Sequence, residues 1–266
     1  MKLFVGIILF LFSMSSFCQV KDSGSVFKPY FQNKPIDANL LLKAPFKWNK
    51  KDILAFGLVV SSGVIAYQYD EKITNIFIEN RKNGLNNIAK YMLQPLGNAF
   101  YVYPAVLATM GVACLTHNKK LAFLSLTSTK SLIFTGLTTQ MIKYAAHRSR
   151  PYESNGNSHI WGGPSLDSQH HSFVSGHSST AFSLATSIAS VYNDMPLVKW
   201  TAYSLATCVE LSRVYDNKHW SSDVISGAAL GYAISRFCYN NDKKRQNNNT
   251  LVLLPSSRGL QILYSF

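Results

Sequence analysis

Three short segments of the chain carry side chains that could bind a phosphate group and break its ester bond. They are Lys143 to Arg150-Pro151, then Ser175-Gly176-His177, then Ser212-Arg213 followed by His219 and Asp223. Cations and backbone N–H groups hold phosphoryl oxygens, one histidine can attack phosphorus, and another can donate a proton. Together the segments predict an anion pocket with a nucleophile and a proton donor.

The first segment supplies two cations. Lys143 provides a point charge, and the planar fork of Arg150 can hold two oxygens at once. If the apolar helix before Lys143 continues, the two lie about two turns apart, and Pro151 ends the helix. Basic residues that close an apolar helix are more often interfacial anchors, so this segment gains meaning only beside the others.

The second segment stands directly before an apolar block, which places it at a helix N-terminus. Unpaired backbone N–H groups there favour an anion. Gly176 lets the backbone approach a ligand closely, Ser175 offers a hydroxyl, and His177 offers a proton near neutral pH. An ordinary helix cap is the alternative interpretation of Ser175.

The third segment joins a cation to a histidine and a carboxylate. His219 and Asp223 are four residues apart, which on a helix places them on one face. The carboxylate can then accept the Nδ1 hydrogen and leave Nε2 free to attack. Arg213 adds a third cation. A single histidine beside an aspartate is more often a surface pair, so this signal also depends on the other segments.

The order and spacing of these motifs resemble a known tripartite signature. Lys-x6-Arg-Pro, Ser-Gly-His and Ser-Arg-x5-His-x3-Asp are similar to the motifs of the type 2 phosphatidic acid phosphatase superfamily, over about Leu121 to Tyr239. The stretches Ser172 to Ser179 and His219 to Val224 resemble its lipid-phosphatase branch. One departure is Val174, where the family usually has proline, but no reacting group is lost.

The resemblance implies an all-α, six-helix bundle that transfers a phosphoryl group without a metal or other cofactor. It implies that His219 attacks phosphorus to form a phosphohistidine, that Asp223 steadies the imidazolium, and that His177 protonates the leaving alkoxide. The implied phosphate-binding groups are Lys143, Arg150, Ser175, the Gly176 amide and Arg213. The implied substrate is a phosphorylated lipid or a small phosphate ester. No residue cluster with metal-site spacing is evident elsewhere.

Three alternatives stay open. A soluble periplasmic acid phosphatase would accept small esters such as nucleotides. A vanadium haloperoxidase would bind vanadate through His219, although the shortness of this chain speaks against it. A non-catalytic membrane protein would keep only a relic of the pocket. Detergent-dependent lipid activity, nucleotide hydrolysis and vanadate-dependent halide oxidation distinguish these classes.

Six apolar blocks predict the all-helical bundle. None shows the alternation of a half-buried strand, and all are rich in Ala, Leu, Ser, Thr and Gly. The blocks are Ile53 to Tyr67, Phe100 to Leu115, Leu121 to Ile142, Ser179 to Tyr192, Leu197 to Leu211 and Val224 to Tyr239. The stretch from Asp70 to Met92 predicts one further amphipathic helix. We therefore expect residues 52–240 to form one helical phosphatase domain.

The two ends of the chain differ from this bundle. Residues 1–18 have the pattern of an export signal, with Lys2 before an apolar run and small residues up to Cys18. Residues 19–51 form a polar lead-in. Residues 241–266 predict a linker and a small β-hairpin that turns at Pro255 to Gly259.

The composition favours an exported, membrane-associated protein with acidic partners. Hydrophobic residues make up 47% of the chain and charged ones 15%, with a formal net charge of +13. Soluble domains carry about 25% charged residues. An anionic membrane surface or a phosphorylated molecule fits this charge. Nucleic acid is disfavoured because the positive residues are dispersed.

Hydropathy leaves the relation to the membrane open. Most blocks are shorter than the ~20 residues of a confident span, so spanning helices and a bundle on a membrane surface both stay possible. Lysines before the first block and basic residues after the last favour a pocket that faces the periplasm. Protease accessibility in spheroplasts, together with carbonate extraction, distinguishes these arrangements.

Overall fold

The computed structural model describes residues 40–41, 43–165, 167, 170–247, 251–256 and 259–264. The described part of the chain is an assembly of helices, which confirms the predicted all-helical class. The predicted export signal at residues 1–18, and most of the lead-in at residues 19–51, lie outside the described residues.

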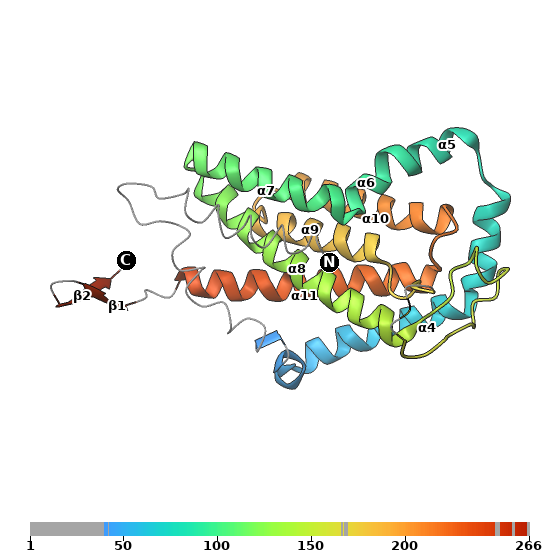
Figure 1. The fold of residues 1–266 in the computed structure, drawn as a ribbon, viewed down its shortest axis with the longest axis horizontal. Coiled ribbons are helices and arrows are strands. Elements are labelled where there is room, and N and C mark those ends of the chain that lie inside the picture. The colour runs from blue at the N-terminus through green and yellow to red at the C-terminus, as the bar shows by residue number, and fades with distance from the viewer. Residues whose placement is uncertain are drawn as a thin grey trace.

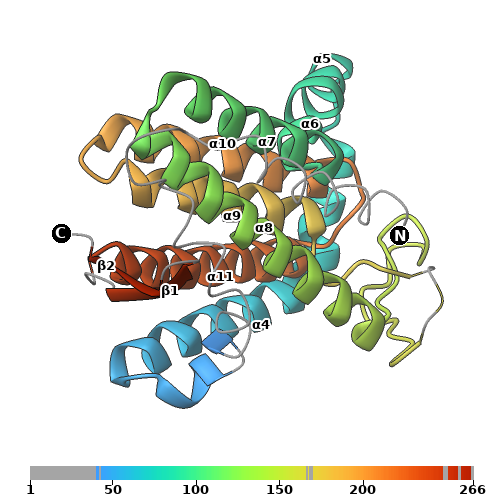
Figure 2. The same cartoon turned by 60° about the vertical axis from the view of Figure 1, so that its left-hand side comes forward.

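Six long helices form the body of the described chain (Figures 1 and 2). They are α4 (Lys50–Glu79), α7 (Ala99–Thr116), α8 (Lys119–Ala146), α9 (Gly176–Val191), α10 (Pro196–Tyr215) and α11 (Ser221–Asn247). Each one overlaps one predicted apolar block, and α4 and α11 extend well beyond theirs. Shorter helices add to this number: η1 (Ala44–Lys47), α5 (Asn83–Asn87), the π-helix η2 (Ile88–Leu93) and α6 (Gln94–Gly97).

The polar stretch from Asp70 to Met92 does not form one separate helix, so that prediction is wrong. α4 continues through it to Glu79, and the rest divides among α5 and η2. The reason is that Asp70 and Thr74 are buried on the face of α4 that packs against α11. These two polar residues therefore belong to the buried face of α4, and the Asp70 carboxylate lies inside the protein.

Helix α9 lies at the centre of the bundle, packed against α8, α10 and α11 (Figure 2). Its contact with α11 depends on two glycines four residues apart. A Cβ atom at Gly227 would stand 2.5 Å from the Ser175 carbonyl oxygen, and one at Gly231 would overlap the Ser179 carbonyl oxygen. Small residues at this spacing let two helix backbones approach closely. The start of α11 is therefore held beside the start of α9.

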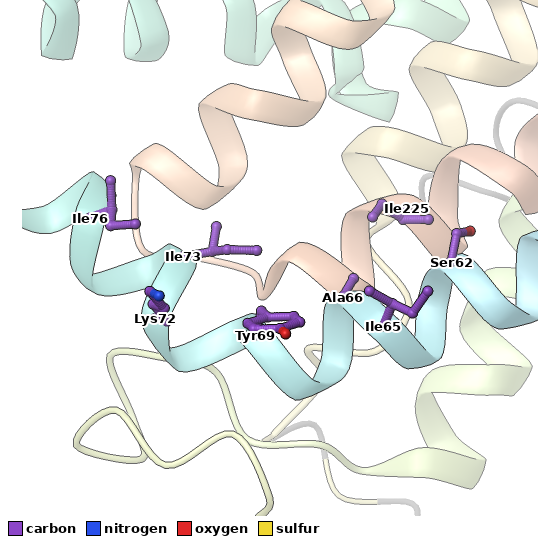
Figure 3. A pocket seen from close by; sticks show the side chains of 8 residues that line it. All are labelled: Ser62, Ile65, Ala66, Tyr69, Lys72, Ile73, Ile76 and Ile225. Carbon is purple, nitrogen blue, oxygen red and sulfur yellow. The ribbon is translucent and has the colours of Figure 1, made fainter.

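The bundle has a polar interior and an apolar exterior. Hydroxyl pairs cross the helix interfaces, with Thr139 Oγ1 3.0 Å from Ser179 Oγ and Ser187 Oγ 2.9 Å from Ser235 Oγ. In the described residues, α4 and α7 are long and apolar enough to cross a membrane. Figure 3 shows a surface pocket where α4 meets α11, lined by Ile65, Ile225 and other mostly apolar side chains. This arrangement favours membrane association.

Helix α11 is longer than predicted and runs through Lys243 to Arg245, which we expected to be a linker. Asp242 explains this, because it is buried and accepts hydrogen bonds from Thr127 Oγ1 at 2.9 Å and from Lys130. Beyond α11, strands β1 (Leu251–Ser256) and β2 (Gly259–Tyr264) pair antiparallel, inside the segment where we predicted a hairpin.

Candidate active site

The predicted site residues come together at one end of the bundle. There α8 and α10 end, α9 and α11 begin, and the connection between α8 and α9 lies at the same end (Figure 1). The four helix ends therefore bring the three sequence segments to one place.

The Ser-Gly-His segment begins α9, as predicted. Ser175 is the N-cap, and its Oγ accepts a hydrogen bond from Ser178 N at 3.4 Å. Its own N–H donates to the main-chain oxygen of Asp223 at 3.0 Å, which ties the segment to α11. A Cβ atom on Gly176 would find only ordinary contacts, 3.9 Å from Lys143 Cε. The protein itself leaves room for alanine there, so any steric need for glycine must come from a ligand.

His219 and Asp223 are neighbours, but not on one face of a helix as predicted. Asp223 lies in the first turn of α11, whereas His219 lies in the connection before it. The Asp223 carboxylate accepts the N–H of Trp220 at 3.0 Å, so it caps the helix and the helix begins after His219. The Nδ1 atom of His219 stands 3.7 Å from Asp223 Oδ2. The imidazole thus turns Nδ1 toward the carboxylate and Nε2 away from it.

The two cations of the first segment are not two turns apart on a helix, because α8 ends at Ala146. His147 takes a left-handed conformation with φ of 46° and turns the chain out of the helix before Arg150. Lys143 remains in the last turn of α8, buried, and its Nζ donates to the carbonyl oxygen of His171. Arg150 lies in the connection, with its N–H donating to Glu153 Oε2 at 3.1 Å.

Electrostatic effects on the two histidines show that the charged groups converge. Burial lowers the pKa of His177 to about 3, and the charges of Arg213, His219, Lys143 and Arg150 contribute in the same direction. A neutral imidazole surrounded by three cationic side chains marks a pocket that favours an anion.

The nucleophile candidate has a similar environment. Burial lowers the pKa of His219 to about 4, and the neighbouring Asp223 opposes this shift only in part. For Asp223, burial acts to raise the pKa, but contacts with His219 and Arg148 bring the pKa below its ordinary value. Burial also lowers the pKa of Lys143 to about 8, with Arg150 adding to the effect.

Several buried polar atoms in the pocket have no hydrogen-bond partner among the described residues. They include Arg213 Nε and His177 Nε2. Buried polar atoms are almost always hydrogen-bonded, so such atoms point to a polar ligand. The Arg213 side chain forms an ion pair with Asp216, with 3.3 Å between Nη1 and Oδ2.

The sequence analysis missed two charged residues of the site, Arg148 and Asp70. Arg148 is fully buried and donates to Asp223 Oδ1 at 2.6 Å and to Asp70 Oδ2 at 2.8 Å. A signal was present for each: Arg148 is a third cation in the first segment, and Asp70 closely follows an apolar block.

Several known proteins resemble this chain over part of its length. The family model described as PAP2 superfamily matches residues 125–247. A lipid A 1-phosphatase of Porphyromonas gingivalis is 38% identical over 69 residues, which is 26% of this chain and 16% of that protein. A lipid A 4'-phosphatase of the same organism is 33% identical over 67 residues, which is 25% of this chain and 28% of that protein. The chain thus spans less than a third of either relative.

A solved structure shows the same fold. It is described as the first transmembrane PAP2 type phosphatidylglycerolphosphate phosphatase from Bacillus subtilis. The likeness has a TM-score of 0.52 at 20% identity and covers 70% of this chain and 94% of that one. The segment at residues 125–247, which contains every predicted site residue, is the part of the chain that resembles the PAP2 superfamily.

Proposed function

We propose that this protein is a phosphatase that hydrolyses a phosphorylated lipid through a phosphohistidine intermediate. The observation that carries the proposal is the buried His219 beside Asp223, in a pocket whose cations and unpartnered donors favour an anion. The similar proteins are lipid A phosphatases by name, and the apolar exterior of α4 and α7 would suit an enzyme that meets its substrate at a membrane.

In the first half-reaction, Nε2 of His219 attacks phosphorus, and the bond from phosphorus to the ester oxygen breaks. His177 relays the proton of the substrate monoanion to the leaving oxygen, which departs as an alcohol. Asp223 stabilises the positive charge that forms on His219. Lys143, Arg150 and the other phosphate-binding groups hold the three phosphoryl oxygens while charge moves onto the leaving oxygen.

In the second half-reaction, His177 takes a proton from water, whose oxygen attacks phosphorus. The bond between phosphorus and His219 breaks, and inorganic phosphate leaves with His219 again neutral. The proton that His177 takes from water then leaves with the phosphate, so the two imidazoles, the substrate monoanion and one water account for every proton and electron pair. The proposal therefore needs no metal ion.

A panel of phosphate esters tests the proposed function. Purified protein in detergent should release phosphate from bis-phosphorylated glucosamine lipids, phosphatidate or phosphatidylglycerol phosphate faster than from nucleotides, and EDTA should leave the rate unchanged. Preference for nucleotides without detergent would indicate a soluble type of acid phosphatase instead. Loss of activity with EDTA would contradict the metal-free mechanism.

We expect the rate to be highest on the acid side of neutrality. The pKa of His219 is lowered to about 4 by burial, so the imidazole becomes neutral and nucleophilic as pH rises through about 4. The pKa of His177 is lowered to about 3, so this imidazole is neutral when it meets the substrate. A substrate monoanion brings the missing proton, and it predominates below the second phosphate pKa of about 6.

The measurement is kcat/KM as a function of pH. It should rise through about 4, following His219, and fall above about 6, following the substrate. A rate that stays constant up to pH 8 would contradict this assignment of the proton.

The proposed location is the cell envelope, with the pocket on the periplasmic side. The lysines before α4 and the basic residues at the end of α11 would then lie on the cytoplasmic side. Protease accessibility in spheroplasts would contradict this orientation if the connection between α8 and α9 were protected.

A further inference from the structure

We infer that Asp70 of α4 is a positioning residue of the active site, which acts through Arg148 on the carboxylate that faces His219. The inference rests on the proposed function. It extends the catalytic apparatus to a helix that precedes the matched family segment, since that segment begins at residue 125.

The first support is a buried chain of three charges. Arg148 lies between two carboxylates, with Nη2 2.8 Å from Asp70 Oδ2 and Nη1 2.6 Å from Asp223 Oδ1. All three side chains have 0% exposure. Charge-assisted hydrogen bonds in such an environment are strong and directional. The position of Asp70 therefore determines where the guanidinium of Arg148 stands.

The second support is that the two carboxylate oxygens of Asp223 have different partners. Its Oδ1 is held by Arg148, while its Oδ2 accepts hydrogen bonds from Ser172 Oγ and from Trp220 N at 3.0 Å. The same Oδ2 faces Nδ1 of His219. The contact at Oδ1 therefore fixes the rotation of the carboxylate, and through it the direction of the histidine ring.

The third support is that Asp70 also holds the beginning of α11. Its Oδ1 accepts from Ser222 N at 2.9 Å and from Ser221 Oγ, and its Oδ2 accepts from Ser222 Oγ. Figure 3 shows the same seam from outside, with Ala66 of α4 near Ile225 of α11. One carboxylate on α4 thus sets both the residues just before Asp223 and the cation that binds it.

Aromatic rings and a carbonyl oxygen enclose the guanidinium of Arg148 and hold it in one orientation. Its guanidinium carbon lies 5.0 Å from the ring centre of Tyr67, 4.8 Å from that of Trp161 and 5.4 Å from that of Trp220. The carbonyl oxygen of Ser158 accepts from Nη2 at 2.9 Å. Because the enclosed guanidinium binds one carboxylate with each of two nitrogen atoms, a shift of one carboxylate moves the other. A lysine ammonium has a single charged group and cannot bind both carboxylates with this fixed geometry.

Two substitutions test the inference in the full chain, purified in detergent. Asp70→Asn keeps the size of the side chain but removes its charge. Arg148→Lys keeps the charge but removes the fork. Each should lower kcat by about 10–100-fold, the range found when metal-binding histidines lose the groups that orient them. KM should change less than about twofold, because the cations that grip the phosphate are untouched.

The double variant supplies a second readout. If both residues act through one contact, Asp70→Asn combined with Arg148→Lys should be no slower than the slower single variant. If the fold-loss in kcat of the double variant were the product of the two single losses, the inference would be overturned.

Thr74→Val is the matched control. Thr74 lies one turn beyond Asp70 on the same buried face of α4, and its hydroxyl has no hydrogen-bond partner among the described residues. The change is nearly isosteric, so kcat should equal that of the unsubstituted protein. An equal loss of kcat in this control, or a loss in Asp70→Asn that lies wholly in KM, would overturn the inference. If Asp70→Asn does not fold, Arg148→Lys carries the same test.

A readout without substrate separates this inference from the proposed function. Diethyl pyrocarbonate acylates the free nitrogen of a neutral histidine, and mass spectrometry can follow the modification of His219. Modification should be several-fold slower in Asp70→Asn than in the unsubstituted protein or in Thr74→Val. Equal rates would overturn the inference even if no ester is hydrolysed. Absence of phosphate release from every ester, with slowed modification, would overturn the proposed function alone.

Discussion

His219→Ala is expected to abolish phosphate release, with a loss in kcat of about 10⁴-fold or more. Removal of a nucleophile leaves only the effect of binding and of transition-state charge stabilisation. The cations of the pocket would still bind the substrate, so KM should stay near its original value. The same variant should form no acid-labile phosphoenzyme when a ³²P-labelled substrate is quenched during turnover.

His117→Asn is the control for this substitution. His117 is exposed at the end of α7, far along the chain from the site, and its backbone is left-handed with φ of 51°. Asparagine tolerates that conformation. Rate and labelling should be unchanged in the control. Turnover that persists in His219→Ala would refute the phosphohistidine route.

Gly231→Ala is expected to have the largest effect on folding. The added methyl group would overlap the Ser179 carbonyl oxygen and stand 2.9 Å from Ser183 N. Both are backbone atoms of α9 that cannot move without shifting the whole helix. We expect the free energy of unfolding to fall by about 3 kcal/mol or more, the upper end of the range for overpacked interiors. Thermal unfolding in detergent measures the loss.

The control makes the same chemical change at an open position. A Cβ atom on Gly57, in the exposed middle of α4, would meet no atom within 4 Å. Replacing glycine by alanine inside a helix stabilises it by about 1 kcal/mol, so Gly57→Ala should unfold at the same temperature or higher. If Gly231→Ala unfolds with the original protein, α9 and α11 are not packed as described.

The sequence predicted which residues come together in the site better than it predicted their local geometry. Motif order and residue type identified His219 and Asp223 as a pair, and the structure places them 3.7 Å apart. The helical periodicity that we used for that pair was the wrong reason. The carboxylate caps α11, so the pair forms across a helix start rather than along a helix. Capping depends on where the helix begins, which residue spacing alone does not determine.

The end of α8 was mispredicted for a related reason. Nothing in the residues between Lys143 and Arg150 forbids a helix, and Pro151 suggested that it would continue. The chain leaves the helix at His147 because the following connection pairs with itself, as in the hydrogen bond from Ser149 N to Ile160 O at 3.0 Å. That contact is between distant residues and leaves no local pattern.

The roles of Asp70 and Arg148 could not be predicted for the same reason, because their contact joins distant parts of the chain and leaves no local pattern. Each is ordinary in its own segment, and only the packing of α4 against α11 brings them together in the interior. The six apolar blocks, by contrast, are local features of composition. Their positions could therefore be predicted, whereas the side chains that connect them could not.

The contact between Ser175 N and the main-chain oxygen of Asp223, made possible by Gly227, has a consequence for how selectivity can change. The start of α9, which carries the Gly176 amide, and the start of α11, which carries the Asp223 carboxylate, are thereby held together as one unit. Adaptation to a bulkier or smaller leaving group must then occur in the connection from residue 152 to residue 165. Grafting a different connection onto this unchanged pair of helices would be a direct way to engineer new substrate preferences.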